Sequence, residues 1–457
     1  MTKTRHNVVL YEAMKRYVAT AIDLVAKHIA QQGSDQKALE FQDDDEDTFF
    51  FTRLGMTDEL QKLPEYHMCL ETLLNDPVIT AQTEVLTGTN SGVRERSLSA
   101  EGLMTRVLDL GMRDGHGDFD GEYFEYEYTQ FEEAYYCSDI GYEVIAPLPG
   151  IAIARSLRLS DDLEITSVPV EALDQTKRKN KPQSSGHPFH DNVCIVRSEC
   201  RLPKVVGDDH QPNAQAREKD ERTQRAVHDR IEQVVNSLRL AGIENAYSSA
   251  IIHRPSEWAF DQDRFFRGRF QPDLFYVSTL EDQWLDDFVQ FWQSFQNAAD
   301  KKRSFLDVAI RRFGYAHERQ RAEDRIIDLM ISAEALFLSD YQKDKYVGEI
   351  RYRLSLRAAL FLASEPESKR TVFRWMRDAY DLRSKLAHGG DVSNAKLPKR
   401  PDGTTLGIEE FVTAIQAYIR LALVKAIHLV NDPSAPKYLI EWEDLLFENN
   451  SNEIVTS

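Results

Sequence analysis

The feature that most constrains this chain is a run of helical periodicity that stops at two consecutive glycines, Gly389 and Gly390. Upstream, apolar residues recur at spacings of three and four: Val372, Trp375, Met376, Ala379, Leu382 and Leu386. That spacing is typical of a helix with one buried face. Glycine readily adopts the left-handed conformation that follows a last helical turn, so the pair marks a helix end. The sequence therefore predicts a helix over Lys369–His388.

Arg383 is out of place on this helix, because it lies on the same line as the apolar Met376 and Ala379. A guanidinium keeps its charge at any ordinary pH, so on an apolar face it needs an anionic partner or an interface. His388 lies roughly 140° further round an ideal helix, on the line of Ser384. Ser384 is one turn before His388 and can orient its imidazole.

An arginine, four residues and a histidine at a helix end resemble the R-x4-6-H motif of the HEPN superfamily. Three segments are similar to the Apea-like HEPN subfamily: Ser332–Leu338, Tyr380–Lys385 and His388–Gly390. The resemblance covers about the last third of the chain, where the motif ends a predicted helix that follows two others in the expected order.

The resemblance implies a metal-independent endoribonuclease that uses no cofactor. His388 would take the proton of the ribose 2′-hydroxyl or protonate the leaving 5′-oxygen. Arg383 would stabilise the negative charge that gathers on the phosphorane. The expected products are a 2′,3′-cyclic phosphate and a 5′-hydroxyl, and DNA would not be cut. In the family two motif helices meet across a homodimer, so both chains furnish one composite cleft for RNA.

Glu334 is the candidate third catalytic residue. It lies on the apolar line of Met330 in its own helix, where a carboxylate needs a partner. Two partners stay open: Arg383, which Glu334 would orient, and an arginine of the next helix, Arg353 or Arg357. Further candidates for contact with substrate are Tyr380, Ser384, Lys385 and Arg357.

Other interpretations of the motif remain open. Ser384 follows the arginine directly, where many HEPN nucleases carry Asn, Asp or His. Some HEPN domains only bind or scaffold, so an inactive dimer is the alternative function. Taken without the resemblance, Arg383 could pair with Asp381 or Glu334 merely to fix helix packing. His388 could equally be a cap that favours the helix dipole.

Net charge and cysteine usage limit the class of protein. The 457 residues carry a net charge of −19, which argues against a general nucleic-acid coat protein. Residues 301–400 hold 22 Lys and Arg against 14 Asp and Glu, which suits one phosphate strand or, equally, a set of solvated helical faces. Four scattered cysteines favour the reducing cytoplasm. No apolar run approaches ~20 residues and Met1–His6 lacks an apolar signal core, so we expect no membrane association.

Periodicity predicts an α+β fold, in which a mixed α/β N-terminal region precedes an all-α helical bundle. Strand patterns occur at 142–146, 151–154, 163–168 and 193–202. We expect a sensing or regulatory region at 1–280 with a break near 176–216, an HEPN helical bundle at 281–445 and a flexible tail at 446–457. A trigger or inhibitor protein from a phage or the host would act on the N-terminal region.

Two segments of the N-terminal half raise metal binding as an alternative. Asp114–Tyr136 opens with glycines and aspartates spaced like a calcium loop, but a glycine-rich turn feeding a β-strand fits it better. His187, His190, Cys194 and Cys200 are ligand types that suit zinc. The two cysteines also fit a plain strand, which would hold them roughly 20 Å apart, and the sequence favours that strand.

The sequence thus predicts an HEPN ribonuclease that acts as an antiviral-defence or toxin-like effector. The alternative is a catalytically inactive HEPN dimer that binds RNA or scaffolds proteins. A third hypothesis is a metal-dependent enzyme that uses the acidic or His/Cys segments.

Overall fold

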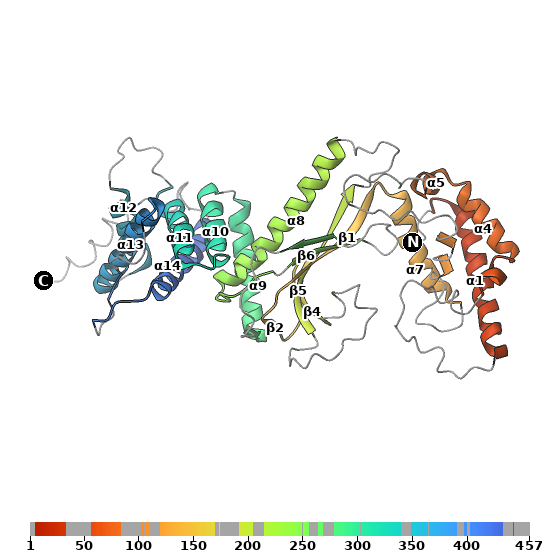
Figure 1. Ribbon diagram of the computed structural model, residues 1–457, viewed down its shortest axis with the longest axis horizontal. Helices are drawn as coiled ribbons and strands as arrows, with labels where there is room; N and C mark the ends of the chain where they lie inside the picture. Colours follow the sequence, from red (N-terminus) through yellow and green to blue (C-terminus); the bar gives the residue numbers. More distant parts are fainter. Residues whose placement is uncertain are drawn as a thin grey trace. The chain divides into compact units, whose positions relative to one another are not determined.

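The computed structural model divides the chain into two compact units (Figure 1). The first unit comprises Met1–Pro147, Ser160–Arg230 and Ala250–Arg267. The second comprises Leu148–Leu159, Ile231–Ser249 and Gly268–Ser457. The residues that the structure describes are 5–32, 56–83, 103–104, 107–108, 119–169, 173, 192–203, 214–248, 250–255, 264–267, 278–301, 303–339, 349–363, 365–390, 397–399, 403–432 and 442.

Helices form one part of the first unit. They are α1 (Val8–Gln32), α3 (Thr57–Leu60), α4 (Pro64–Leu74), α5 (Pro77–Thr83) and α7 (Gly121–Tyr136). The helices α1 and α4 pack side by side (Figure 1). Fully buried side chains from α1, α4 and α7 share one core, including Leu10, Met14, Tyr17, Cys69, Leu73, Phe124, Tyr128 and Phe131. These side chains recur at helical spacing, which is why the helices bury one face each.

An antiparallel sheet forms the other part of the first unit. Its strands, in spatial order, are β4 (Leu163–Pro169), β5 (Asn192–Pro203), β1 (Asp139–Pro147), β6 (Ala250–Pro255) and β7 (Arg264–Arg267). The boundary between the units falls near the end of β3 (Leu157–Ser160), which precedes β4 in the sheet order. The strands expected at 142–146, 151–154, 163–168 and 193–202 are confirmed.

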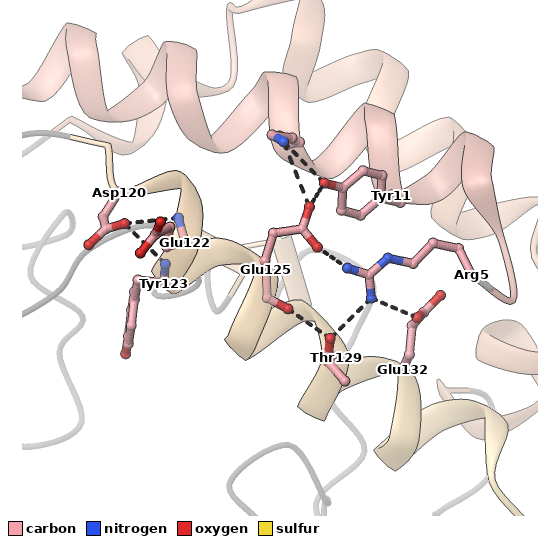
Figure 2. Close-up of polar contacts among 9 residues, drawn as sticks. Arg5, Tyr11, Asp120, Glu122, Tyr123, Glu125, Thr129 and Glu132 are labelled. Carbon is pink, nitrogen blue, oxygen red and sulfur yellow. Dashed lines mark hydrogen bonds and ion pairs between the residues drawn. The ribbon is translucent and has the colours of Figure 1, made fainter. Parts of the chain in front are cut away.

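An arginine near the N-terminus fastens the start of the chain to α7 (Figure 2). Arg5 donates to Thr129 Oγ1 (3.1 Å) and Glu132 Oε2 (3.1 Å), and it also pairs with Glu125. Tyr11 of α1 donates to the same Glu125 carboxylate. The Glu132 side chain is buried, so this pairing compensates a carboxylate that burial would otherwise destabilise.

The segment expected to be a turn feeding a β-strand is instead the helix α7, so that prediction is wrong. Asp120 caps the helix, and its carboxylate accepts from the backbone N–H groups of Glu122 (2.9 Å) and Tyr123 (3.1 Å). Figure 2 shows this cap at the start of α7. Glu127, a ligand of the supposed calcium loop, is a buried residue in mid-helix. The other ligand positions, His116 and Asp118, lie outside the described residues.

The second unit is mostly helical. Its helices after residue 281 are α9 (Asp282–Asp300), α10 (Ser304–His317), α11 (Ala322–Phe337), α12 (Ile350–Leu362), α13 (Pro366–Ala387) and α14 (Ile408–Asn431). A short parallel pair, β2 (Ile151–Ile153) with β8 (Ser278–Leu280), belongs to the same unit. The α+β class is therefore confirmed, with a strand-containing N-terminal region and packed helices at the C-terminal end.

The long helix α8 (Ala214–Leu240) ends inside the second unit, where a buried arginine holds it. Arg239 donates to the carbonyls of Ala246 (2.8 Å) and Gly314 (3.2 Å) and to Asn236 Oδ1 (3.0 Å). Burial lowers the pKa of the guanidinium to about 10. A Cβ added at Gly314 would lie 2.5 Å from Asn236 Oδ1, so only glycine allows this close approach.

The helix α14 is long and apolar enough to cross a membrane by length and composition, which is weak evidence because buried core helices pass the same test. Its apolar residues Phe411, Ile415 and Ile419 are fully buried. It also carries two cations that bond to carbonyls of its own unit: Arg420 donates to Leu240 and Lys425 to Phe361. These features are ordinary for a helix in the core of a bundle.

Candidate active site

The helix α13 ends as its two glycines predict. His388 is the C-cap, and Gly389 follows with a left-handed φ of 76°. The backbone N–H of Gly389 donates to the Leu386 carbonyl (3.0 Å), and that of Gly390 to the Lys385 carbonyl (2.9 Å). This pair of bonds is a Schellman motif, which satisfies carbonyls that the helix end leaves open. The motif fixes the backbone that carries His388.

Arg383 lies on the inner side of α13, where it faces α11. Its Nη2 atom is 3.6 Å from Glu334 Oε2, and each side chain is 27% exposed. The Nε–H of Arg383 is buried and has no hydrogen-bond partner among the described residues. The guanidinium also lies 6.0 Å from the ring centre of Tyr380, within cation–π range. Three of the predicted site residues therefore come together.

The electrostatics of this cluster follow from partial burial. Burial raises the pKa of the Glu334 carboxyl above its usual value, and the nearby Arg383 charge opposes the rise. Burial also raises the pKa of the Tyr380 hydroxyl, with the Glu334 charge adding to the effect. The Arg383 charge thus supports the ionised form of a carboxylate that burial disfavours.

His388 lies apart from that cluster on the exposed side of the helix. Its backbone N–H donates to the Ser384 carbonyl (3.2 Å), as a capping residue does. Since His388 is five positions after Arg383, the two side chains leave an ideal helix in directions roughly 140° apart. Within one chain, the arginine thus points toward α11 and the imidazole toward solvent.

The remaining candidates for substrate contact occupy different places. Ser384 and Lys385 are half-buried in the last turn of α13, and Lys385 packs over Gly390. Arg357 donates to the Phe337 carbonyl (2.7 Å), whereas Glu334 pairs with Arg383. Its guanidinium also lies 5.0 Å from the ring centre of Trp442. Arg357 therefore links α12 to the end of α11 and to the Trp442 ring.

One contact beside the motif was not expected from the sequence. Arg351 of α12 donates to both carboxylate oxygens of Asp381, at 2.8 Å and 3.0 Å. Asp381 is thus paired with another helix rather than with Arg383. No sequence signal identifies this partner, because the spacing within α13 says nothing about which turn of α12 lies opposite.

The proposed zinc ligands are only partly described. Cys194 is buried in β5, and burial raises the pKa of its thiol to about 12. Cys200 is half-buried six residues further along the same strand, which agrees with the favoured strand interpretation. His187 and His190 lie outside the described residues. Among the residues that are described, no group of three or more His, Cys, Asp or Glu is placed to hold a metal.

No model of a known protein family matches the chain, and neither a curated protein nor a solved structure matches it. The resemblance to HEPN proteins therefore depends on the motif residues themselves, and the function drawn from it is a proposal.

Proposed function

We propose that the chain is a metal-independent endoribonuclease of the HEPN type. The observation that carries the proposal is the state of Arg383: a permanent cation, partly exposed, with a buried Nε–H that lacks a partner among the described residues. It precedes by five residues an exposed imidazole whose backbone a Schellman motif fixes. A cation with unused donors and an imidazole on the same helix end are the two groups that cleavage of a phosphodiester needs, and a second chain would bring them to one phosphate.

The reaction follows from these two groups. The 2′-hydroxyl attacks the adjacent phosphorus and loses its proton to an imidazole, which acts as general base. Arg383 donates hydrogen bonds to the equatorial oxygens of the phosphorane, where negative charge accumulates. The bond to the 5′-oxygen then breaks, and that oxygen takes a proton from an imidazole. The products are a 2′,3′-cyclic phosphate and a 5′-hydroxyl.

A homodimer supplies the complete site in this proposal. Arg383 and His388 diverge by roughly 140° on their helix, so one chain does not aim both groups at one phosphate. A second copy would add a second imidazole, which allows separate groups to act as base and acid. The pairing of two motif helices is a feature of the family that the chain resembles.

Glu334 has a positioning role in this scheme. Its carboxylate lies within ion-pair distance of Arg383 but beyond hydrogen-bond distance, at 3.6 Å. It restrains the guanidinium without using up its donors. The resemblance also supports a cytoplasmic antiviral-defence or toxin-like effector, in which the N-terminal region responds to a trigger protein.

The test is incubation of the purified chain with RNA in the presence of EDTA. We expect cleavage that persists in the chelator, disappears in His388→Ala, and leaves 2′,3′-cyclic phosphate ends. Binding without cleavage would instead support an inactive HEPN dimer. The Glu334–Arg383 ion pair favours that second candidate, because the pair would also form if its role were only to hold α11 against α13. Loss of cleavage in EDTA would point to a metal-dependent enzyme.

A further inference from the structure

The outer face of α13 carries a line of basic residues that leads to the motif histidine. Its members are Arg370, Arg374, Arg377, Lys385 and His388, and one acidic residue, Asp381, lies among them. All six recur at spacings of three and four, so they share one side of the helix. Arg370, Arg374 and His388 are exposed, and Arg377 is partly exposed. The line extends over 18 residues, or about 27 Å of helix.

The neighbouring helix adds to the positive charge. Together α12 and α13 contain nine Lys and Arg against three Asp and Glu, in a chain whose net charge is −19. Arg351 of α12 reaches the line through its contact with Asp381. We refer to Arg351, Tyr352, Arg370, Arg374 and Arg377 together as the α12–α13 face.

Arg351 is held by Asp381, but the three arginines of α13 on this face are only weakly paired or make no ion pair with the described residues. Arg377 and Arg370 pair with acids on their own helix, at 3.4 Å and 3.5 Å, and the Arg370 side chain is 70% exposed. Pairs this exposed contribute ~0–1 kcal/mol, so a phosphate can displace the carboxylate at little cost. Within the described part of the chain, Arg374 makes no ion pair.

An exposed aromatic ring completes the face. Tyr352 is 50% exposed, and its ring meets Phe373 of α13 edge-on with the centres 5.6 Å apart. The contact restrains the ring while leaving part of it in solvent. Interleaved cations and aromatic rings are what single-stranded nucleic acid requires, because phosphates pair with arginine and bases stack on rings.

From this arrangement we propose that the α12–α13 face binds single-stranded RNA and guides it along α13 toward His388. The inference builds on the proposed ribonuclease function and names the track of its substrate. A length of about 27 Å suits a site of a few nucleotides, at the short end of the ~4–16 nucleotides seen in single-strand sites.

The experiment measures binding of a fluorescently labelled, single-stranded 2′-O-methyl RNA of about 12 nucleotides to the full chain. The modified strand is not cleavable by 2′-hydroxyl attack, so binding is read independently of catalysis. The test variant is Arg370→Glu/Arg374→Glu, and the matched control is Arg311→Glu/Arg321→Glu. The control reverses two exposed arginines of the same unit that lie outside the face.

We expect the test variant to bind about tenfold more weakly and to lower the slope of log K against log salt by about 1.4, since each lost phosphate contact removes ~0.7 for a single strand. Tyr352→Ala should weaken binding with no change in that slope. The Arg370→Gln/Arg374→Gln variant removes the two charges without reversing them and should lose less affinity for RNA. It tests the same face if the charge-reversed variant does not fold.

Failure of the face and failure of the proposed function are separable. If the wild type binds the modified strand but cleaves no natural RNA, the proposed ribonuclease function is wrong, whereas RNA binding by the α12–α13 face is still supported. If the test and control variants lose the same affinity, or if the wild type binds no RNA, the face is overturned. Equally strong competition by duplex RNA would overturn the single-strand preference.

Discussion

The Nη2 atom of Arg383 lies 3.6 Å from Oε2 of Glu334, inside ion-pair range and outside hydrogen-bond range. The two side chains come from α13 and α11, and each is about a quarter exposed. At this distance the carboxylate directs the guanidinium by charge, and the N–H donors of Arg383 make no hydrogen bond within the part of the chain that the structure describes. A phosphodiester oxygen that reaches Arg383 therefore need not break an existing hydrogen bond.

The first prediction is that Glu334→Gln lowers RNA cleavage by up to about a hundredfold, because loss of the charge frees the guanidinium from its orientation. Glu334→Asp keeps the charge and should restore part of the rate. A positioning role predicts that kcat falls more than KM rises. Single-turnover cleavage assays check this, and unchanged cleavage by Glu334→Gln would exclude the orienting role.

The same substitution should remove a pH dependence of stability. Burial raises the pKa of Glu334, so folding disfavours the ionised carboxylate. The native state then holds more protons than the unfolded state between the usual and the raised pKa, and stability falls as pH rises through that window. Glu334→Gln lacks this loss. Its stability relative to the wild type in denaturant unfolding should rise from pH 4 toward neutrality, and a difference that stays constant over this range would contradict the argument.

The sequence predicted Arg383 as one partner for Glu334 and left Arg353 and Arg357 open as others. A charged residue on an apolar line needs a partner, but periodicity does not say which arginine of another helix lies opposite it. The helix α7 was missed for a physical reason as well. Its alternating tyrosines and glutamates look like a strand with period two, whereas the buried positions Phe124, Tyr128 and Phe131 have helical spacing.

The periodicity of a sequence does not predict contacts between helices or strands that are distant in sequence. The bond from Arg351 to Asp381 depends on which turns of α12 and α13 lie side by side. The burial of His317 depends on the packing of α10 against α14. Local patterns give the face of a helix but not its register against a neighbour, so such partners require the structure.

The second prediction concerns His388. Replacement by alanine should abolish cleavage, a loss of at least about 10²-fold for removal of a general acid or base. Stability should change by less than about 0.5 kcal/mol, because the side chain is exposed. Gel assays of RNA cleavage and thermal unfolding check both parts. The matched control is His428→Ala, an exposed histidine of α14, which should cleave as the wild type does.

The third prediction concerns the helix end that carries the histidine. Gly389 has a φ of 76°, and a β-branched residue there costs about 1–2 kcal/mol. We expect Gly389→Val to lose that stability and much of the cleavage, because the Schellman bonds that place His388 weaken. Asparagine tolerates the left-handed region, so Gly389→Asn should retain more of both. Urea unfolding measures the stability of the variants, and cleavage assays measure their activity. Gly141→Val is the control, because a Cβ added at Gly141 would meet nothing within 4 Å. Equal activity for Gly389→Val and Gly389→Asn would contradict the role of the motif.

The fourth prediction concerns a half-buried histidine of the second unit. His317 shares its Nδ1 with the Phe313 carbonyl (2.9 Å) and its Nε2 with the Gln416 amide (3.0 Å). Burial lowers its pKa to about 3, and the charges of Arg239 and Arg325 add to the effect. With Nδ1 donating and Nε2 accepting, the imidazole must be neutral, so protonation would break the bond to Gln416.

The unfolded chain protonates this imidazole near its ordinary pKa of 6.5, whereas the folded chain does so only near 3. Stability from this group is therefore complete above pH 6.5 and is lost as pH falls toward 3, with a slope of up to about 1.4 kcal/mol per pH unit. His317→Gln removes that slope, so the variant should be less stable at pH 8 and approach the wild type as pH falls. Denaturant unfolding between pH 8 and pH 4 measures the difference, with the exposed His428→Gln as control. A constant difference across that range would mean that His317 does not stay neutral in the folded protein.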